Sequence, residues 1–306
     1  MNRNAMHSAN RSGFWFAIAS AICFSTLGLF AKGLFAAGVA VPTTLAWRFT
    51  IASMVLWLFE LGFSANDEER RLRRKIRANR KVRLKLMLLG LLGFAPQAGL
   101  YFMTVSLLDP GITSLLLYLY PAFVVAIAFL FKGAQPKPLQ LLALGLSLLG
   151  CVITFWQAGN YPWYGLALGV FVALVYALYL VWGETVLEGI PPLYATAVIM
   201  TVASIVYWLI AILTGTAALP SSLQHLVLAA GVALFGTVLP VITLFKAMQR
   251  IGAAQTSIIS TIEPVCTNIF SMLLFGELIT GRRIAGGILI LAGVILVQSM
   301  QTDQQA

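Results

Sequence analysis

The chain has 306 residues, of which 60% are hydrophobic and 10% charged, and its formal net charge is +10. A soluble domain usually carries about 25% charged residues, so this chain lacks the polar side chains that would coat a globule in water. The composition therefore excludes a soluble enzyme, a disordered protein and a small disulfide-stabilised secreted domain. It predicts an integral membrane protein.

The apolar segments have the length of membrane-spanning helices. A helix needs about 20 apolar residues to cross the hydrocarbon core of a bilayer, and the sequence lacks the alternating pattern of transmembrane β-strands. We therefore predict an all-α membrane protein with ten transmembrane helices, at residues 14–34, 43–63, 85–108, 112–131, 139–157, 163–186, 192–213, 223–245, 253–275 and 284–301. The link between the third and fourth ranges is very short, so nine helices are the alternative count.

The basic residues are distributed unevenly over the predicted loops. Most of the 20 Lys and Arg residues lie on the side of the N-terminus, many of them in a loop at 64–84, whereas Arg282 and Arg283 are the basic residues of the outer loops. The positive-inside rule therefore places both termini in the cytoplasm. The run Arg70-Arg71-Leu72-Arg73-Arg74-Lys75 is explained as a topology signal that contacts anionic lipid headgroups, so we expect no nucleic-acid partner.

Residues of the first half recur in the second half at a constant shift of 143 positions. The matches are Gly93 with Gly236, Phe102 with Phe245, Thr113-Ser114 with Thr256-Ser257, Pro121 with Pro264, Gly133 with Gly276 and Gly150 with Gly293. They predict two repeats, residues 1–157 and 158–306, with five helices each. An odd number of helices reverses the polarity of the second copy, which predicts inverted-topology repeats. Such repeats are typical of carriers that alternate between outward-open and inward-open states.

Several motifs resemble those of a known family. Ile262-Glu263-Pro264-Val265, Gly276-Glu277-Leu278-Ile279-Thr280, Gly287 and Leu291-Ala292-Gly293-Val294 are similar to the C-terminal signature of EamA-type carriers, in the drug/metabolite transporter superfamily. Leu119-Tyr120-Pro121-Ala122 and Arg48-Phe49 also resemble family features, although Gly133-Ala134 replaces the expected Gly-Glu pair. The aromatic-rich chain looks most like bacterial aromatic amino acid exporters. This resemblance implies a multi-pass protein of the inner (cytoplasmic) membrane.

Glu263 is the clearest ionisable residue within a predicted helix. Charged groups inside a bilayer are costly and often functional, so the carboxyl group is a candidate for binding a substrate ammonium or a proton. Alternatively, it braces its own helix by accepting internal hydrogen bonds. Pro264 follows it, and the repeat places Tyr120 and Pro121 at the same positions of the first half. Proline weakens a helix, so we predict that Pro121 and Pro264 form two matched gating hinges.

Four further charged residues lie inside predicted helices. Lys32 is near an outer end, where its side chain can extend to the interface. Arg48 is more confined, so we expect it to contact a carboxylate or helix carbonyls in a structural role. Glu60 and Glu184 lie near inner ends, and exposure at the interface explains both.

Deep aromatic and amide side chains predict an aromatic-lined cavity. A tyrosine hydroxyl at membrane depth needs a polar partner, which favours a cavity or a helix interface over lipid. On a continuous helix, Tyr118 and Tyr120 would be about 200° apart, so we expect that both do not face the same cavity. With Glu263, the predicted substrate-binding residues are Gln97, Tyr101, Tyr118, Tyr120, Tyr176, Tyr179 and Trp182.

The predicted function is secondary transport of a small, amino acid-like molecule, because the chain lacks a phosphate-binding loop for ATP. We expect no cofactor and no metal, since Cys23, Cys151, Cys266, His7 and His225 form no cluster in the sequence. The expected partners are the substrate and the lipid bilayer, and a monomer suffices. The alternatives are a drug or cationic-metabolite exporter of the same fold and, in another class, an intramembrane enzyme or a non-transporting membrane subunit. Export driven by the substrate gradient or by proton exchange through Glu263 is equally compatible with the sequence.

Overall fold

The computed structural model describes residues 3–62, 75–108, 110–133, 135–156, 160–275 and 280–303. The structure is 86% helical, and these ranges contain no strand, which confirms the prediction of an all-α protein. Asp109, Ala134, most of the basic loop with Arg70 to Arg74, and residues 276–279 of the C-terminal motif lie outside the described residues.

The helices occur in chain order along the predicted ranges, and two short stretches, η1 and η2, are π-helices. The elements are α1 (Arg3–Phe24), α2 (Leu27–Ala36), α3 (Val41–Gly62), α5 (Arg80–Leu88), η1 (Leu89–Phe94), α6 (Ala95–Leu107), α7 (Pro110–Leu117), α8 (Tyr120–Lys132), α9 (Pro138–Phe155), α10 (Trp163–Val186), α11 (Pro192–Leu213), α12 (Leu223–Ala233), η2 (Leu234–Val238), α13 (Leu239–Ser260), α14 (Glu263–Phe275) and α15 (Gly281–Asp303).

Seven helical stretches in the described part of the chain are long and apolar enough to cross a membrane. The predicted ranges 14–34, 253–275 and 284–301 are not among the seven. The first falls on α1 and α2, the second is divided between α13 and α14, and the third lies within α15. The count of ten transmembrane helices therefore stays a prediction.

Two helices are interrupted at positions that correspond under the shift of 143 residues. α7 ends at Leu117 and α8 begins at Tyr120, while α13 ends at Ser260 and α14 begins at Glu263. Pro121 and Pro264 therefore occupy the second position of a new helix, where the missing N–H removes no helical hydrogen bond. The sequence predicted bends at these prolines, and the structure has a two-residue turn before each of these helices, at 118–119 and 261–262.

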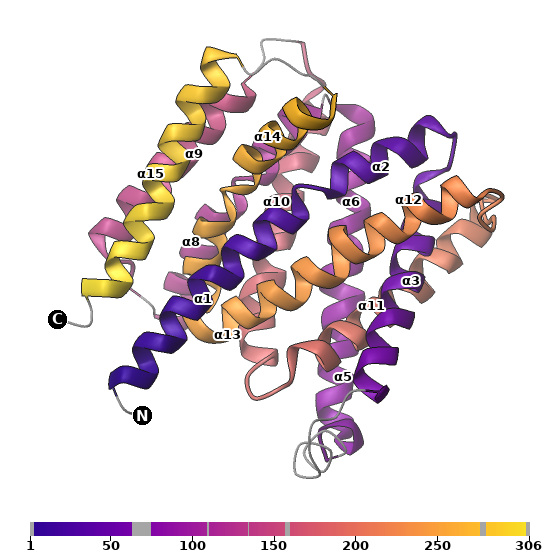
Figure 1. Cartoon of the computed structure of the whole chain (residues 1–306), viewed down its shortest axis with the longest axis horizontal. Helices are drawn as coiled ribbons and strands as arrows, with labels where there is room; N and C mark the ends of the chain where they lie inside the picture. Colours follow the sequence, from indigo (N-terminus) through magenta and orange to yellow (C-terminus); the bar gives the residue numbers. More distant parts are fainter. Residues whose placement is uncertain are drawn as a thin grey trace.

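Corresponding helices of the two halves pack against one another. α3 packs along α11 and α9 packs along α15, while α1 runs beside α13 (Figure 1). Contacts with other elements are also repeated: α12 packs on α3 as α5 packs on α11, and η2 contacts α1 as η1 contacts α10. The α9–α15 pair and the α3–α11 pair lie at opposite sides of the molecule (Figure 1).

The α9–α15 pair is held at close range by small residues. A Cβ atom added to Gly150 would lie 2.6 Å from the carbonyl oxygen of Gly286, and one added to Gly293 would lie 2.6 Å from that of Ala143. These two contacts correspond under the shift of 143 residues. Small residues allow helix backbones to approach closely where the hydrophobic effect provides no attraction, as in a bilayer.

We therefore predict that Gly150→Ala and Gly293→Ala each lower the free energy of unfolding by about 1–3 kcal/mol, because the added methyl group overpacks the contact. The matched control is Gly145→Ala on α9, where an added Cβ atom meets nothing within 4 Å. Thermal unfolding of the purified protein in detergent measures the effect. An equal loss of stability in Gly145→Ala would show that the contact is not its cause.

Candidate functional site

The break between α13 and α14 places Glu263 in the first turn of a helix, deep in the protein. The N-terminus of a helix stabilises negative charge through its dipole. The Glu263 side chain is enclosed by protein, yet part of its surface is accessible. No hydrogen bond or ion pair joins its carboxyl group to another described residue. A confined acidic group without such a partner is a candidate binding site.

Tyrosines on α6, on α10 and at the start of α8 lie within electrostatic range of this carboxyl group. It interacts electrostatically with the phenols of four predicted site residues, Tyr101, Tyr118, Tyr120 and Tyr176. The ring centroids of Tyr120 and Tyr176 are 4.6 Å apart, and Tyr176 stacks on Tyr179 with a centroid distance of 6.1 Å. We call Glu263 and these five tyrosines the central cluster.

Tyr118 and Tyr120 both belong to the central cluster, and the expectation that they do not face the same cavity stays a prediction. That expectation assumed a continuous helix, whereas the chain makes a turn at residues 118–119. The rings still pack on different neighbours. Tyr118 stacks on Phe155 at 6.0 Å, and Tyr120 lies against Tyr176.

Arg48 lies at the edge of the central cluster and stabilises an irregular helix. Its side chain is 5% exposed, its Nε donates to the Thr237 hydroxyl at 2.6 Å, and one terminal nitrogen donates to the Gly236 carbonyl at 3.1 Å. Both partners belong to η2. Backbone groups displaced from regular helix geometry need such partners in a bilayer, so the contacts indicate a structural role. Of the two expected kinds of partner, Arg48 therefore bonds a helix carbonyl, together with a hydroxyl, and no carboxylate among the described residues.

Tyr207 has a corresponding role in the other half, and sequence reasoning missed it. Its hydroxyl donates to the carbonyl of Ala95 at 2.7 Å, directly after η1. Tyr179 differs, since its side chain is 2% exposed and its hydroxyl has no hydrogen-bond partner among the described residues. A buried, unpaired phenol costs stability, which identifies Tyr179 as a candidate for a functional contact.

The other predicted site residues are not joined to the central cluster by the contacts of the described residues. Trp182 is 37% exposed and makes none of the ring contacts of the cluster. Gln97 is partly buried on α6, one turn before Tyr101. Lys32 lies in α2, and its side chain is outside the description.

Two carboxylates have structural partners that the sequence did not reveal. Glu60 is 1% exposed and forms an ion pair with Arg77 at 2.8 Å. The prediction that Glu60 is exposed at the membrane interface is therefore wrong. Glu184 is partly buried, and its Oε1 accepts a hydrogen bond from the backbone N–H of Ala253 at 3.1 Å. Gly252, the residue before Ala253, has φ 77°. A Cβ atom added to Gly252 would lie 2.8 Å from Oε1 of Glu184. Glycine is therefore required at the kink.

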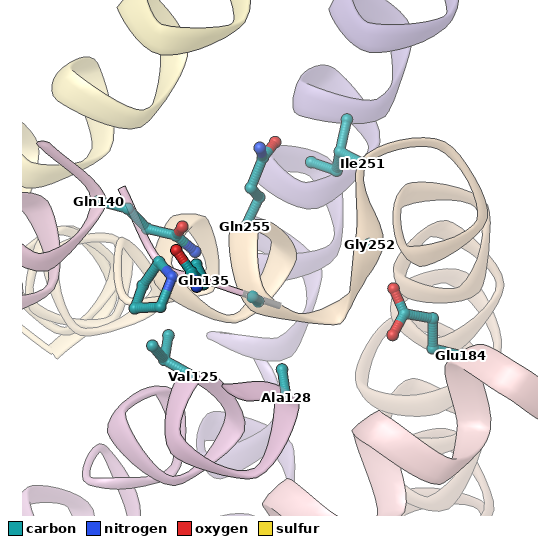
Figure 2. Close-up of a pocket in the computed structure, with 10 residues that line it drawn as sticks. Val125, Ala128, Gln135, Gln140, Glu184, Ile251, Gly252 and Gln255 are labelled. Atoms are coloured by element: carbon teal, nitrogen blue, oxygen red, sulfur yellow. The ribbon is translucent and has the colours of Figure 1, made fainter. Parts of the chain in front are cut away.

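A pocket of about 240 Å³ opens beside this kink. Its polar lining consists of Gln135, Gln140, Gln255 and Glu184. Figure 2 shows the three glutamines on one side of the Gly252 segment and Glu184 on the other. No sequence signal identified this pocket, because its residues come from four separate parts of the chain.

The comparisons with known proteins agree with this architecture. A family model, the EamA-like transporter family, matches residues 11–156 and again residues 163–299. The chain belongs to this family. It is therefore a multi-span membrane protein of a transporter family.

Three relatives have been named only as uncharacterized transporters. YyaM of Bacillus subtilis is 24% identical, and the match covers 82% of each protein. A protein of Archaeoglobus fulgidus is 25% identical, and the match covers 64% of this chain and 70% of that protein. A protein of Synechocystis is 27% identical, and the match covers 72% of this chain and 68% of that protein. A solved crystal structure aligns with 94% of this chain and 99% of its own at a TM-score of 0.77 and 18% identity, which supports the fold.

The two buried phenols lead to a stability prediction. Tyr207→Phe removes the hydrogen bond from its hydroxyl to the Ala95 carbonyl, so it should lower the free energy of unfolding by about 1 kcal/mol. Tyr179→Phe is the matched control and should leave stability unchanged or raise it, because its hydroxyl has no described partner. Thermal unfolding of both variants decides the matter. The assignment fails if Tyr179→Phe is the more destabilised.

Proposed function

We propose that the chain is a secondary transporter that exports aromatic or neutral amino acids. The observation that carries this proposal is the Glu263 carboxyl group, which has no bonded partner among the described residues and is surrounded by tyrosine phenols. A carboxylate binds the ammonium of an amino acid, while aromatic rings stack on an aromatic side chain or lie against a cation.

The remaining polarity of the central cluster suits a zwitterion. The first turn of α8, which carries Tyr120, offers the positive end of a helix dipole to a substrate carboxylate. Arg48 is engaged with η2 through two hydrogen bonds. Phosphorylated sugars would require several buried cations at the site, so the cluster disfavours them.

Alternating access around the central cluster is the proposed mechanism. It requires ten transmembrane helices in two inverted repeats, residues 1–157 and 158–306. Three observations support this arrangement: the corresponding helix breaks, the packing of α3 on α11 and of α9 on α15, and the double match of the family model. We place the protein in the inner membrane as a monomer with both termini in the cytoplasm, on the distribution of basic residues and the family resemblance.

An exporter of cationic metabolites or drugs is the second candidate. The carboxyl group of Glu263 with the rings of Tyr120 and Tyr176 would also accept an organic cation that lacks a carboxylate. The names of the relatives favour transport over an intramembrane enzyme or a non-transporting subunit.

Counterflow in liposomes that contain the purified protein tests the proposed function. We expect exchange of labelled phenylalanine, tryptophan, threonine or methionine. Glu263→Gln should weaken it about 10- to 100-fold, since a hydrogen bond to a charged group contributes about 1.5–3 kcal/mol. Glu188→Gln, an exposed loop position, is the control and should behave like the wild type.

The outcomes separate the two candidates. Exchange of an aromatic quaternary amine without exchange of any amino acid would favour the cation exporter. Absence of exchange for every compound would contradict a carrier function for this chain.

The paired prolines give a separate prediction for gating. Pro121→Ala and Pro264→Ala each add a backbone N–H that gains a helical acceptor only when the two adjoining helices join, and one such hydrogen bond of about 1 kcal/mol would favour the joined conformation. We expect the transport rate to fall about fivefold with little change in substrate affinity. Pro192→Ala, at the start of the uninterrupted helix α11, is the control. Unchanged rates in both hinge variants would refute the hinge proposal.

A further inference from the structure

The pocket beside Gly252 has the chemistry of a binding site for a small polar solute. Amide groups provide both donors and acceptors, so Gln135, Gln140 and Gln255 offer partners to a carboxylate and to an ammonium. Glu184 adds negative charge, and the described lining includes no Lys or Arg. A volume of about 240 Å³ is below the range of about 300–1,000 Å³ for drug-sized ligands. These properties fit a zwitterion of amino acid size.

The pocket lies along the same helices as the central cluster. On α10, Glu184 follows Tyr176 by eight residues, or about 12 Å of helix. On α8, the lining residues Val125 and Ala128 follow Tyr120 within three turns. The pocket and the central cluster therefore share α8 and α10, with the pocket further along both helices.

A hydrogen bond of the central cluster joins two of the helices that also line the pocket. The hydroxyl of Tyr120 donates to the backbone carbonyl of Ser257 at 3.3 Å, which joins α8 to the last part of α13. Val125 on α8 packs in one apolar cluster with Ile258 and Ile259 just beyond this contact. Tyr120 and this apolar packing thus lie along the segments of α8 and α13 that run from the central cluster to the pocket.

The predicted topology places the pocket on the cytoplasmic side. It is formed where α8 ends, α9 begins and α10 ends, next to the Gly252 kink. Three basic residues stand at these positions: Lys132 ends α8, Lys137 precedes α9, and Arg250 lies two residues before Gly252. The positive-inside rule expects such residues at a cytoplasmic face.

We propose that this pocket is a second substrate site, in which a zwitterionic solute binds from the cytoplasm before the Tyr120–Ser257 contact opens toward Glu263. The proposal rests on the proposed function, because it assumes that the same small solute is carried. It adds a separate site with its own ligands, whose occupation does not require Glu263.

Cysteine labelling tests the site directly. Gln140→Cys is introduced into a chain whose three native cysteines are replaced by alanine or serine. A membrane-impermeant maleimide is then applied to inside-out vesicles with and without phenylalanine or threonine. We expect either amino acid to slow labelling at least fivefold, and equally so when Glu263→Gln is added. Lys137→Cys, which is exposed and outside the pocket lining, is the control and should label at the same rate throughout.

Each result has a defined meaning. Loss of protection in the Glu263→Gln chain would show that the central cluster controls labelling, which overturns the second site. Labelling from the opposite face alone would overturn its cytoplasmic position. Transport without protection would overturn the second site but not the proposed function. Protection without transport would support binding in the pocket and contradict the proposed function.

A kinetic measurement provides a second test that does not depend on an introduced cysteine. Gln140→Ala removes one polar ligand, and we expect it to raise the KM for cytoplasmic phenylalanine about fivefold, in line with one lost hydrogen bond. An unchanged KM, in a variant whose thermal unfolding matches the wild type, would count against the site.

Discussion

The rest of the structure depends on the need to satisfy every backbone polar group that lies away from water. A regular helix does this by itself, but an interrupted helix in a bilayer leaves groups that a side chain must bond. Arg48 bonds the Gly236 carbonyl in η2, Tyr207 bonds the chain directly after η1, and Glu184 bonds the chain after Gly252. These three polar side chains therefore stabilise irregular backbone, and Arg48 has the structural role that the sequence predicted for it. This leaves Glu263 as the exception.

The same interruptions create the central cluster. A helix that ran through residues 118–119 would turn Tyr118 and Tyr120 to opposite sides, and one that ran through 261–262 would bury Glu263 without the positive end of a new helix. The breaks instead bring a carboxyl group and several phenols together at the start of two helices. Irregular backbone is costly here, and it is retained where it places polar groups inside an otherwise apolar protein.

The sequence predicted those features that depend on local composition and spacing. Apolar length located the helices, and the repeated prolines located the two helix breaks. Four of the tyrosines predicted to line a cavity lie within electrostatic range of Glu263, and their role in binding stays a prediction. The Arg77 partner of Glu60, the role of Tyr207 and the pocket beside Gly252 could not be predicted. Each depends on which distant segments meet, and apolar length and spacing within one helix do not contain that information.

The correspondence between the halves extends to the backbone but not to the chemistry. Both halves have a helix that restarts before a proline, yet the first has Tyr120 where the second has Glu263. A nearly symmetric frame allows two conformations of similar free energy, since the halves can exchange roles. Within the two halves, the carboxyl group of Glu263 would bind a positively charged group in both the outward-open and the inward-open conformation. In the proposed mechanism, symmetry thus provides the conformational change, and the loss of symmetry at this one pair of residues provides the binding site.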